Sequence, residues 1–125
     1  MSIIRAAQAP RFDLEGFHFL GLVAPSRGAT ELCAWRLEID PGAVSAPHRL
    51  NHEEIFMPLH GAFTVTLDGE EIELRAGDAC AVPACSLLQV TNGGDEVAHA
   101  LVCIAAGFTA TYEDGREAGT PPWAQ

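Results

Sequence analysis

The sequence predicts a single all-β domain, and three observations support this prediction. Short stretches of β-type residues are separated at regular intervals by turns that contain glycine or proline. Within these stretches apolar and polar residues alternate with the period of two of an extended strand. No segment has the pattern of a long amphipathic helix. Many short antiparallel strands with little helix indicate a sandwich or a barrel, of which the jelly roll is a common form.

Residues 33–39 form the first clear strand of the prediction. Four of them would share one face of an extended segment, while polar and small residues occupy the other face. A helical period fits this segment less well. The residues on the apolar face are Cys33, Trp35, Leu37 and Ile39.

Residues 63–75 predict a β-hairpin. Apolar residues alternate with polar ones up to Leu67, and the alternation resumes at Ile72. Between them, Asp68 and Gly69 suit a two-residue turn, because both central residues of such a turn take positive φ. Further on, residues 98–106 are apolar almost throughout, apart from His99, which predicts a strand covered on both faces.

The length of 125 residues predicts one domain over residues 1–125, with one hydrophobic core. Residues 113–125 contain the run Thr120-Pro121-Pro122-Trp123 and predict an extended, polyproline-like tail. Because an exposed tryptophan would be costly, we expect Trp123 to dock on the barrel or on a partner subunit.

Charge and composition narrow the partners and the compartment. Seventeen acidic against seven basic side chains give a formal charge of −10, and this field repels nucleic acid and anionic membranes. No apolar run is long enough to span a bilayer, and the first residues lack the apolar core of a secretory signal. The four cysteines show no C-x-x-C spacing, so we expect thiols rather than disulfides. We therefore expect a cytoplasmic protein that binds neither nucleic acid nor membrane.

A first motif lies within residues 42–61. Five residues separate Gly42 from His48, Glu54 follows six positions after His48, and Gly61 closes the motif. This spacing resembles the first motif of the cupin superfamily. In that motif a second histidine stands where this chain has Leu50.

A second motif lies within residues 77–92. Gly77, Pro83 and Asn92 fall at the spacing of the second cupin motif, while Cys85 replaces its second glycine and Leu88 replaces its histidine. The resemblance covers roughly residues 35–108 and matches seven positions of the two motifs. It implies a cupin double-stranded β-helix, which is a jelly-roll barrel. It says less about activity, because this fold hosts many unrelated functions.

The resemblance also implies a metal site that has lost two of its four ligands. In the family, three histidines and a glutamate converge inside the barrel on Fe, Mn, Ni or Zn, and three or four protein ligands are usually needed to hold such an ion. Leu50 and Leu88 cannot donate, so His48 and Glu54 are the only matched ligands. We expect no tightly held metal, and at most weak or adventitious Zn, Fe, Mn or Ni. His52, in the loop between the two ligand positions, is a possible substitute ligand.

The same residues predict an apolar pocket that holds one histidine and one carboxyl group. His48 and Glu54 are the candidate catalytic residues, since burial opposes both charged forms while mutual attraction favours them. The sequence leaves open whether they move protons or form a remnant ion pair. The candidate ligand-binding residues around them are Leu50, Phe56, Leu88 and Val90.

Three functions are compatible with this pattern. The first is a protein that binds a small molecule in the barrel without a metal. The second is a cupin enzyme, namely an isomerase, a cyclase or a metal-dependent dioxygenase-like enzyme that recruits His52. The third is a structural or regulatory dimer without catalysis. Family members commonly form homodimers, and the apolar residues 17–23 predict an exposed strand edge that a second copy would cover.

Overall fold

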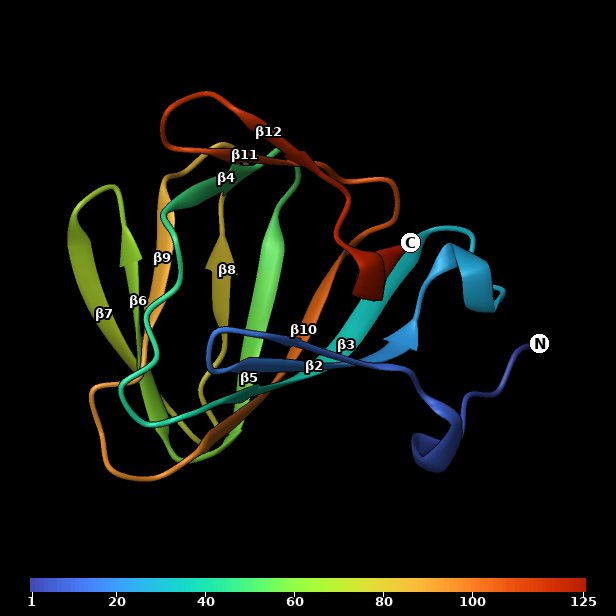
Figure 1. Ribbon diagram of the computed structural model, residues 1–125, viewed down its shortest axis with the longest axis horizontal. Coiled ribbons are helices and arrows are strands. Elements are labelled where there is room, and N and C mark those ends of the chain that lie inside the picture. Colours follow the sequence, from blue (N-terminus) through green and yellow to red (C-terminus); the bar gives the residue numbers. More distant parts are fainter.

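The computed structural model describes all 125 residues and contains two six-stranded antiparallel sheets that face each other (Figure 1). The all-β jelly-roll prediction is confirmed. The first sheet has the order β1 (Arg11–Leu14), β2 (Phe17–Val23), β3 (Leu32–Ile39), β10 (Ala98–Ala105), β5 (Glu54–His60) and β8 (Cys80–Val82). The second has the order β12 (Glu117–Gly119), β11 (Ala110–Tyr112), β4 (His48–Leu50), β9 (Leu88–Thr91), β6 (Ala62–Leu67) and β7 (Glu70–Arg75). Short 3-10 turns span Ala6–Gln8, Pro25–Arg27 and Pro122–Ala124.

The core lies between the two sheets and follows the alternation of the sequence. The four apolar residues predicted to share one face of residues 33–39 are all buried on the inner face of β3. In β10 the inner residues are buried, but the outer ones, such as Leu101 and Cys103, are only partly covered. The prediction that both faces of this strand are covered is therefore correct for one face and incomplete for the other.

Turn residues hold the strands in the predicted register. Asp68 and Gly69 have φ of 49° and 87°, as the two-residue turn between β6 and β7 requires. Cys85 has φ of 68°, so the glycine conformation of the second motif is kept by a residue for which it is unfavourable. Asn92 is fully buried, and its Nδ2 donates to the carbonyl oxygens of Ile39 and Glu96 at 2.9 and 2.8 Å. The asparagine of the second motif therefore fixes loops at the end of the barrel.

Residues 113–125 differ from the predicted extended tail. The chain turns back after β11, forms β12 alongside it, and ends in the 3-10 turn that contains Trp123. The indole stacks on Phe19 of β2, with ring centroids 3.6 Å apart and planes at 7°. The predicted docking of Trp123 on the barrel is confirmed. Arg27 Nη2 also donates a hydrogen bond to the Trp123 carbonyl oxygen at 2.8 Å. These two contacts join the closing segment, residues 113–125, to the core.

Replacing Trp123 tests how much this docking stabilises the fold. We expect Trp123→Ala to lower the free energy of unfolding by about 2 to 3 kcal/mol, because a large stacked ring leaves a partly collapsible void. Trp123→Phe retains an aromatic face against Phe19 and should lose less than half as much. Urea unfolding followed by far-UV circular dichroism measures both. Equal stability of Trp123→Ala and the wild type would contradict the assignment.

The predicted strand edge at residues 17–23 is wrong. β2 is paired on both sides, with β1 and with β3, so the edge of this sheet is β1. The homodimer stays a prediction, but the strand proposed for it is covered within the chain. None of the helical segments is long and apolar enough to cross a membrane.

Candidate acid-base site

The site is built where the first motif passes from one sheet to the other. β4 carries His48 and Leu50 on the second sheet, and a short loop leads to Glu54, the first residue of β5 on the first sheet. The side chains of His48 and Leu50 point to one side of β4, since residues two apart in a strand share a face. Leu50 and Glu54 are 7% and 4% exposed, which places that face inside the barrel.

His48 is held as a neutral imidazole with one free nitrogen. Its Nδ1 lies 2.8 Å from the carbonyl oxygen of Ala46, and because a carbonyl only accepts, Nδ1 carries the proton and donates it. Nε2 is then left with its lone pair. Burial lowers the pKa of His48, and the hydrogen bond to Ala46 opposes this effect only in part. At neutral pH the imidazole of His48 is therefore uncharged.

Glu54 is held as a neutral carboxylic acid. Burial raises the pKa of its carboxyl group to about 8, and no hydrogen bond or neighbouring charge contributes to the shift. Its strand neighbours are Val82 on β8 and Ile104 on β10, which offer only apolar side chains. A carboxyl group without a polar partner keeps its proton, because the charged form is poorly solvated there. At pH 7 the carboxyl group of Glu54 is therefore mostly protonated.

The two groups do not form an ion pair. Burial alone determines the shift at Glu54, while burial and a backbone carbonyl determine that at His48, and neither is influenced by the other. No ion pair between the two side chains is present in the structure. The barrel holds a neutral carboxyl group on one sheet and a neutral imidazole on the other.

The four predicted ligand-binding residues all lie in the interior. Their exposed fractions do not exceed 7%, and all belong to the core cluster between the sheets. Leu88 is the cross-strand neighbour of His48, and Val90 is that of Val65. Phe56 packs edge-on against Phe63, with ring centroids 6.1 Å apart. The four predicted ligand-binding residues are Leu50, Phe56, Leu88 and Val90.

The donor set does not fit the metal site that the fold implies. Leucines occupy two of the four ligand positions and are buried inside the barrel. No three histidine, cysteine, aspartate or glutamate side chains lie close enough together to hold an ion. His52 does not complete a set, and its Nδ1 is 2.8 Å from Oδ1 of the adjacent Asn51 in the loop. One histidine and one protonated carboxyl group are a poor match for Zn, Fe, Mn or Ni.

A further residue of the site lies outside both motifs. Tyr112 on β11 is the cross-strand neighbour of His48, and the row continues through Leu88 to Leu67. Paired residues of an antiparallel sheet project to the same side, so Tyr112 stands beside His48 at the barrel mouth. It is the only tyrosine in the chain. No motif identified it, because only the register of β4 with β11 brings it to the site.

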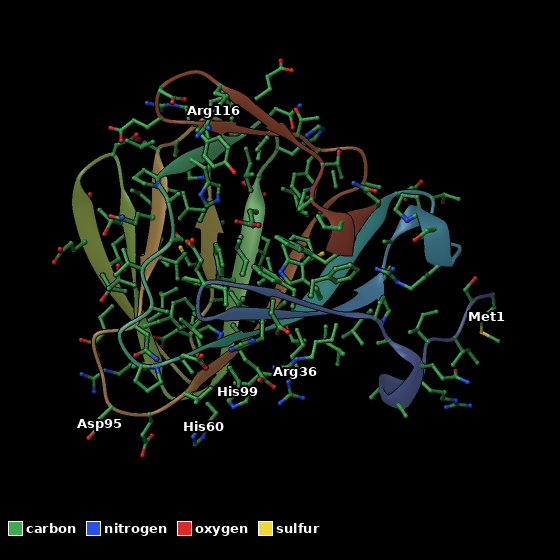
Figure 2. The ribbon with its side chains drawn as sticks, in the orientation of Figure 1. Met1, Arg36, His60, Asp95, His99 and Arg116 are labelled. Atoms are coloured by element: carbon green, nitrogen blue, oxygen red, sulfur yellow. The ribbon has the colours of Figure 1, made fainter.

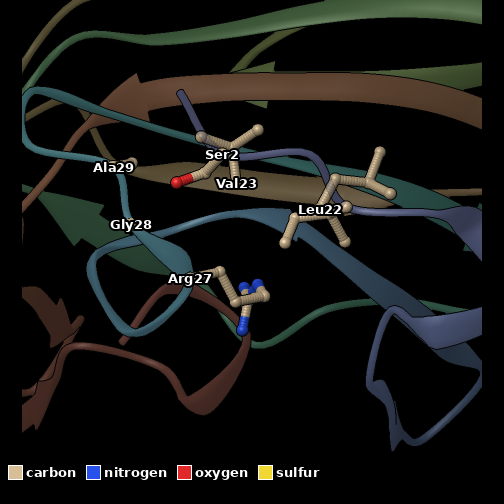
Figure 3. Close-up of a pocket in the computed structure, with 7 residues that line it drawn as sticks. Ser2, Leu22, Val23, Arg27, Gly28 and Ala29 are labelled. Atoms are coloured by element: carbon tan, nitrogen blue, oxygen red, sulfur yellow. The ribbon is translucent and has the colours of Figure 1, made fainter.

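A hollow of about 410 Å³ opens at this mouth. The loop before β4 and the turn from β11 to β12 line it, with Ala46, Pro47, Tyr112, Glu113, Asp114 and Arg116. Figure 2 shows Arg116 at the end of the molecule opposite His60 and His99. A second hollow, of about 320 Å³, lies between the N-terminal arm, β2 and the turn at Arg27, and none of the site residues lines it (Figure 3).

The remaining histidines and cysteines are separate from the site. His18 bridges Asp13 and Asp40 at 2.5 and 2.9 Å, and these carboxylates raise its pKa. The rings of His60 and His99 lie 5.8 Å apart at the other end of the barrel (Figure 2). All four cysteines are free thiols. Cys85 is exposed, and the other three are buried or partly buried.

The chain belongs to the cupin family, whose domain model matches residues 35–104. It is 30% identical over 109 residues to a β-D-galactosidase of Mycobacterium tuberculosis, covering 84% of this chain and 94% of that protein. A cupin-superfamily sugar phosphate isomerase from Silicibacter pomeroyi is 28% identical, with a TM-score of 0.68 over 79% of this chain and 66% of that one. The polyketide cyclase RemF from Streptomyces resistomycificus, at 16% identity, has a TM-score of 0.77 over 98% and 88% of the two chains. The last similarity concerns the fold alone.

Proposed function

We propose that this chain is an acid-base enzyme that binds a small organic molecule at the mouth of its barrel and needs no tightly held metal. Glu54 donates a proton to the bound molecule and His48 accepts one. The two groups approach the ligand from facing sheets, since β5 and β4 belong to different sheets. Such a pair suits reactions in which one atom gains a proton while another loses one.

The observation that carries the proposal is the unpartnered carboxyl group of Glu54. It is 4% exposed, and no group of the chain stabilises its charged form. Burying a carboxyl group that makes no hydrogen bond to the protein costs free energy. A residue that served only the fold would be better replaced by an apolar one. On the facing sheet, His48 carries a free Nε2 because Nδ1 is bound to Ala46.

The relatives support a small organic substrate. Among the proteins similar to this chain are a galactosidase and a sugar phosphate isomerase. Cleavage of a glycoside and isomerisation of a sugar both need protons to be placed and removed. The common requirement is an acid and a base, which Glu54 and His48 can supply without a metal.

A second candidate is a binding protein without catalysis. The apolar lining of the barrel supports this candidate. Leu50 and Leu88 stand at two metal-ligand positions of the family and offer apolar contacts to a hydrophobic or amphiphilic ligand. A dimer that acts only through its surface is the third hypothesis, and it gives no reason for the buried carboxyl group. Turnover separates the first two candidates.

The proposal is tested with a panel of glycosides, sugar phosphates and cyclic ketones, after dialysis against a chelator. We expect Glu54→Gln and His48→Asn each to lower kcat/KM about a hundredfold or more, because each removes a proton-transfer group of similar shape. His60→Gln, an exposed histidine at the other end of the barrel, is the matched control and should keep full activity. Activity that disappears with the chelator and returns with metal would refute the proposal. Binding without turnover by any member of the panel would favour the second candidate.

The pH profile is a separate prediction. Activity requires Glu54 with its proton and His48 without one, so kcat/KM should be bell-shaped. The alkaline limb should fall near pH 8, where Glu54 ionises, and the acid limb below the ordinary histidine pKa of 6.5. Glu54→Gln should abolish the alkaline limb along with most of the rate. An alkaline limb that persists in the residual activity of Glu54→Gln would assign it to another group.

A further inference from the structure

The hollow at the barrel mouth has the chemistry of a binding site for a neutral sugar ring, and we infer that it recognises a neutral glycoside through Tyr112, Glu113 and Arg116. This inference rests on the proposed function and names its substrate class. The hollow holds about 410 Å³, enough for one hexose ring. Its wall includes Ala46, whose carbonyl oxygen orients His48. His48 and Glu54 do not line the hollow themselves, and Ala46 links its wall to the acid-base pair.

The walls of the hollow offer three kinds of contact. Tyr112 contributes an aromatic ring, and the guanidinium carbon of Arg116 lies 4.5 Å from its centroid. Arg116 donates hydrogen bonds and has Asp114 as its nearby acid, with Nε 3.9 Å from Oδ2. Glu113 is left as a carboxylate that can accept from hydroxyl groups. An aromatic ring beside an acceptor and a donor suits a molecule with apolar C–H faces and a hydroxyl rim.

The hairpin that carries these side chains is fixed to the strand that carries His48. Three backbone hydrogen bonds hold the turn: Tyr112 N to Arg116 O at 2.8 Å, Gly115 N to Tyr112 O at 2.9 Å, and Glu113 N to Pro47 O at 3.3 Å. Asp114 closes it further by accepting from the Arg116 amide at 3.0 Å. The binding groups are thus held at a constant place relative to His48, and little order has to be gained on binding.

Charge selects a neutral ligand over an anionic one. Two carboxylates and one guanidinium line the hollow, and the whole chain carries a formal charge of −10. A phosphate or carboxylate on the sugar would meet this negative field at close range. The hollow should therefore bind a neutral sugar more tightly than a sugar phosphate.

Binding is tested with methyl β-D-galactopyranoside and galactose 6-phosphate, titrated into the ¹⁵N-labelled chain and followed by amide chemical shifts. We expect the neutral sugar to shift residues 46–48 and 112–116 at millimolar concentration, and the phosphate to bind at least tenfold more weakly. Tyr112→Ala and Glu113→Gln should each weaken the neutral sugar at least fivefold. Glu117→Gln removes an exposed carboxylate from the same hairpin outside the hollow and should change nothing.

Three outcomes would overturn the inference. These are equal or tighter binding of the phosphate, shifts confined to other parts of the surface, and unchanged affinity in Glu113→Gln and Tyr112→Ala. Glu54→Gln separates sugar binding from proton transfer, because it should bind methyl β-D-galactopyranoside normally. If no neutral sugar bound while Glu54→Gln still abolished turnover of another substrate, the inference would fail and the acid-base proposal would stand.

Discussion

Glu54→Gln is expected to change the pH dependence of stability more than any other single substitution. In the folded chain the carboxyl group keeps its proton up to about pH 8, while in the unfolded chain it ionises near pH 4.5. Between these values unfolding releases a proton, so rising pH favours the unfolded state. Relative to Glu54→Gln, the wild type should lose about 1.4 kcal/mol of unfolding free energy per pH unit, or about 5 kcal/mol in all.

Urea unfolding at half-unit intervals from pH 4 to pH 9 measures this effect. The difference between the two proteins isolates Glu54, because the contributions of His18 and of the other ionisable groups cancel. Glu71→Gln, an exposed glutamate on β7, is the control and should follow the wild-type curve. Stability curves for Glu54→Gln and the wild type that run parallel across this range would show that Glu54 is ionised in the folded protein.

The second large effect is expected from restoring the two missing ligands. Leu50 is two residues from His48 on β4, and Leu88 is its cross-strand neighbour on β9, so both point into the same interior. Leu50→His combined with Leu88→His should provide three imidazoles and the Glu54 carboxyl group, a set that suits Zn, Ni or Mn. The metal would also favour ionisation of Glu54, because a cation stabilises the carboxylate.

Metal analysis after dialysis measures the outcome. We expect about one ion per chain in the double variant, and a metal-dependent gain in unfolding free energy of about 3 kcal/mol at a hundredfold excess of metal over its Kd. Each single variant has only three donors and should bind much more weakly. The measurement in chelator shows how much the buried histidines destabilise the fold by themselves. Failure of the folded double variant to bind metal would mean that the barrel no longer brings these positions together.

The sequence predicted the barrel because its signals are local. Turn residues such as Asp68 and Gly69 specify their own backbone conformation, and alternation specifies which face of each strand is buried. Turns and alternation need no knowledge of distant neighbours. The placement of Leu50 and Leu88 inside the barrel came from the resemblance to the two cupin motifs, and both residues are buried there.

The parts that could not be predicted depend on contacts between distant segments. The three residues of β11 have no alternating pattern of their own, and only pairing with β4 places Tyr112 beside His48. The prolines of residues 113–125 predicted an extended tail, because the sequence does not reveal that Trp123 stacks on Phe19. Whether His48 and Glu54 formed an ion pair also depended on their surroundings. Burial keeps both neutral, and a sequence motif does not specify that outcome.

The central claim is that Glu54 is a protonated acid at neutral pH, and the titration of its own carboxyl carbon tests this claim most directly. The wild type and Glu54→Gln, both labelled with ¹³C at glutamate and glutamine side chains, identify the Glu54 signal by its disappearance. We expect this signal to titrate with a pKa of about 8. A midpoint near the ordinary glutamate value of 4.5 would contradict it and leave the barrel without an acid.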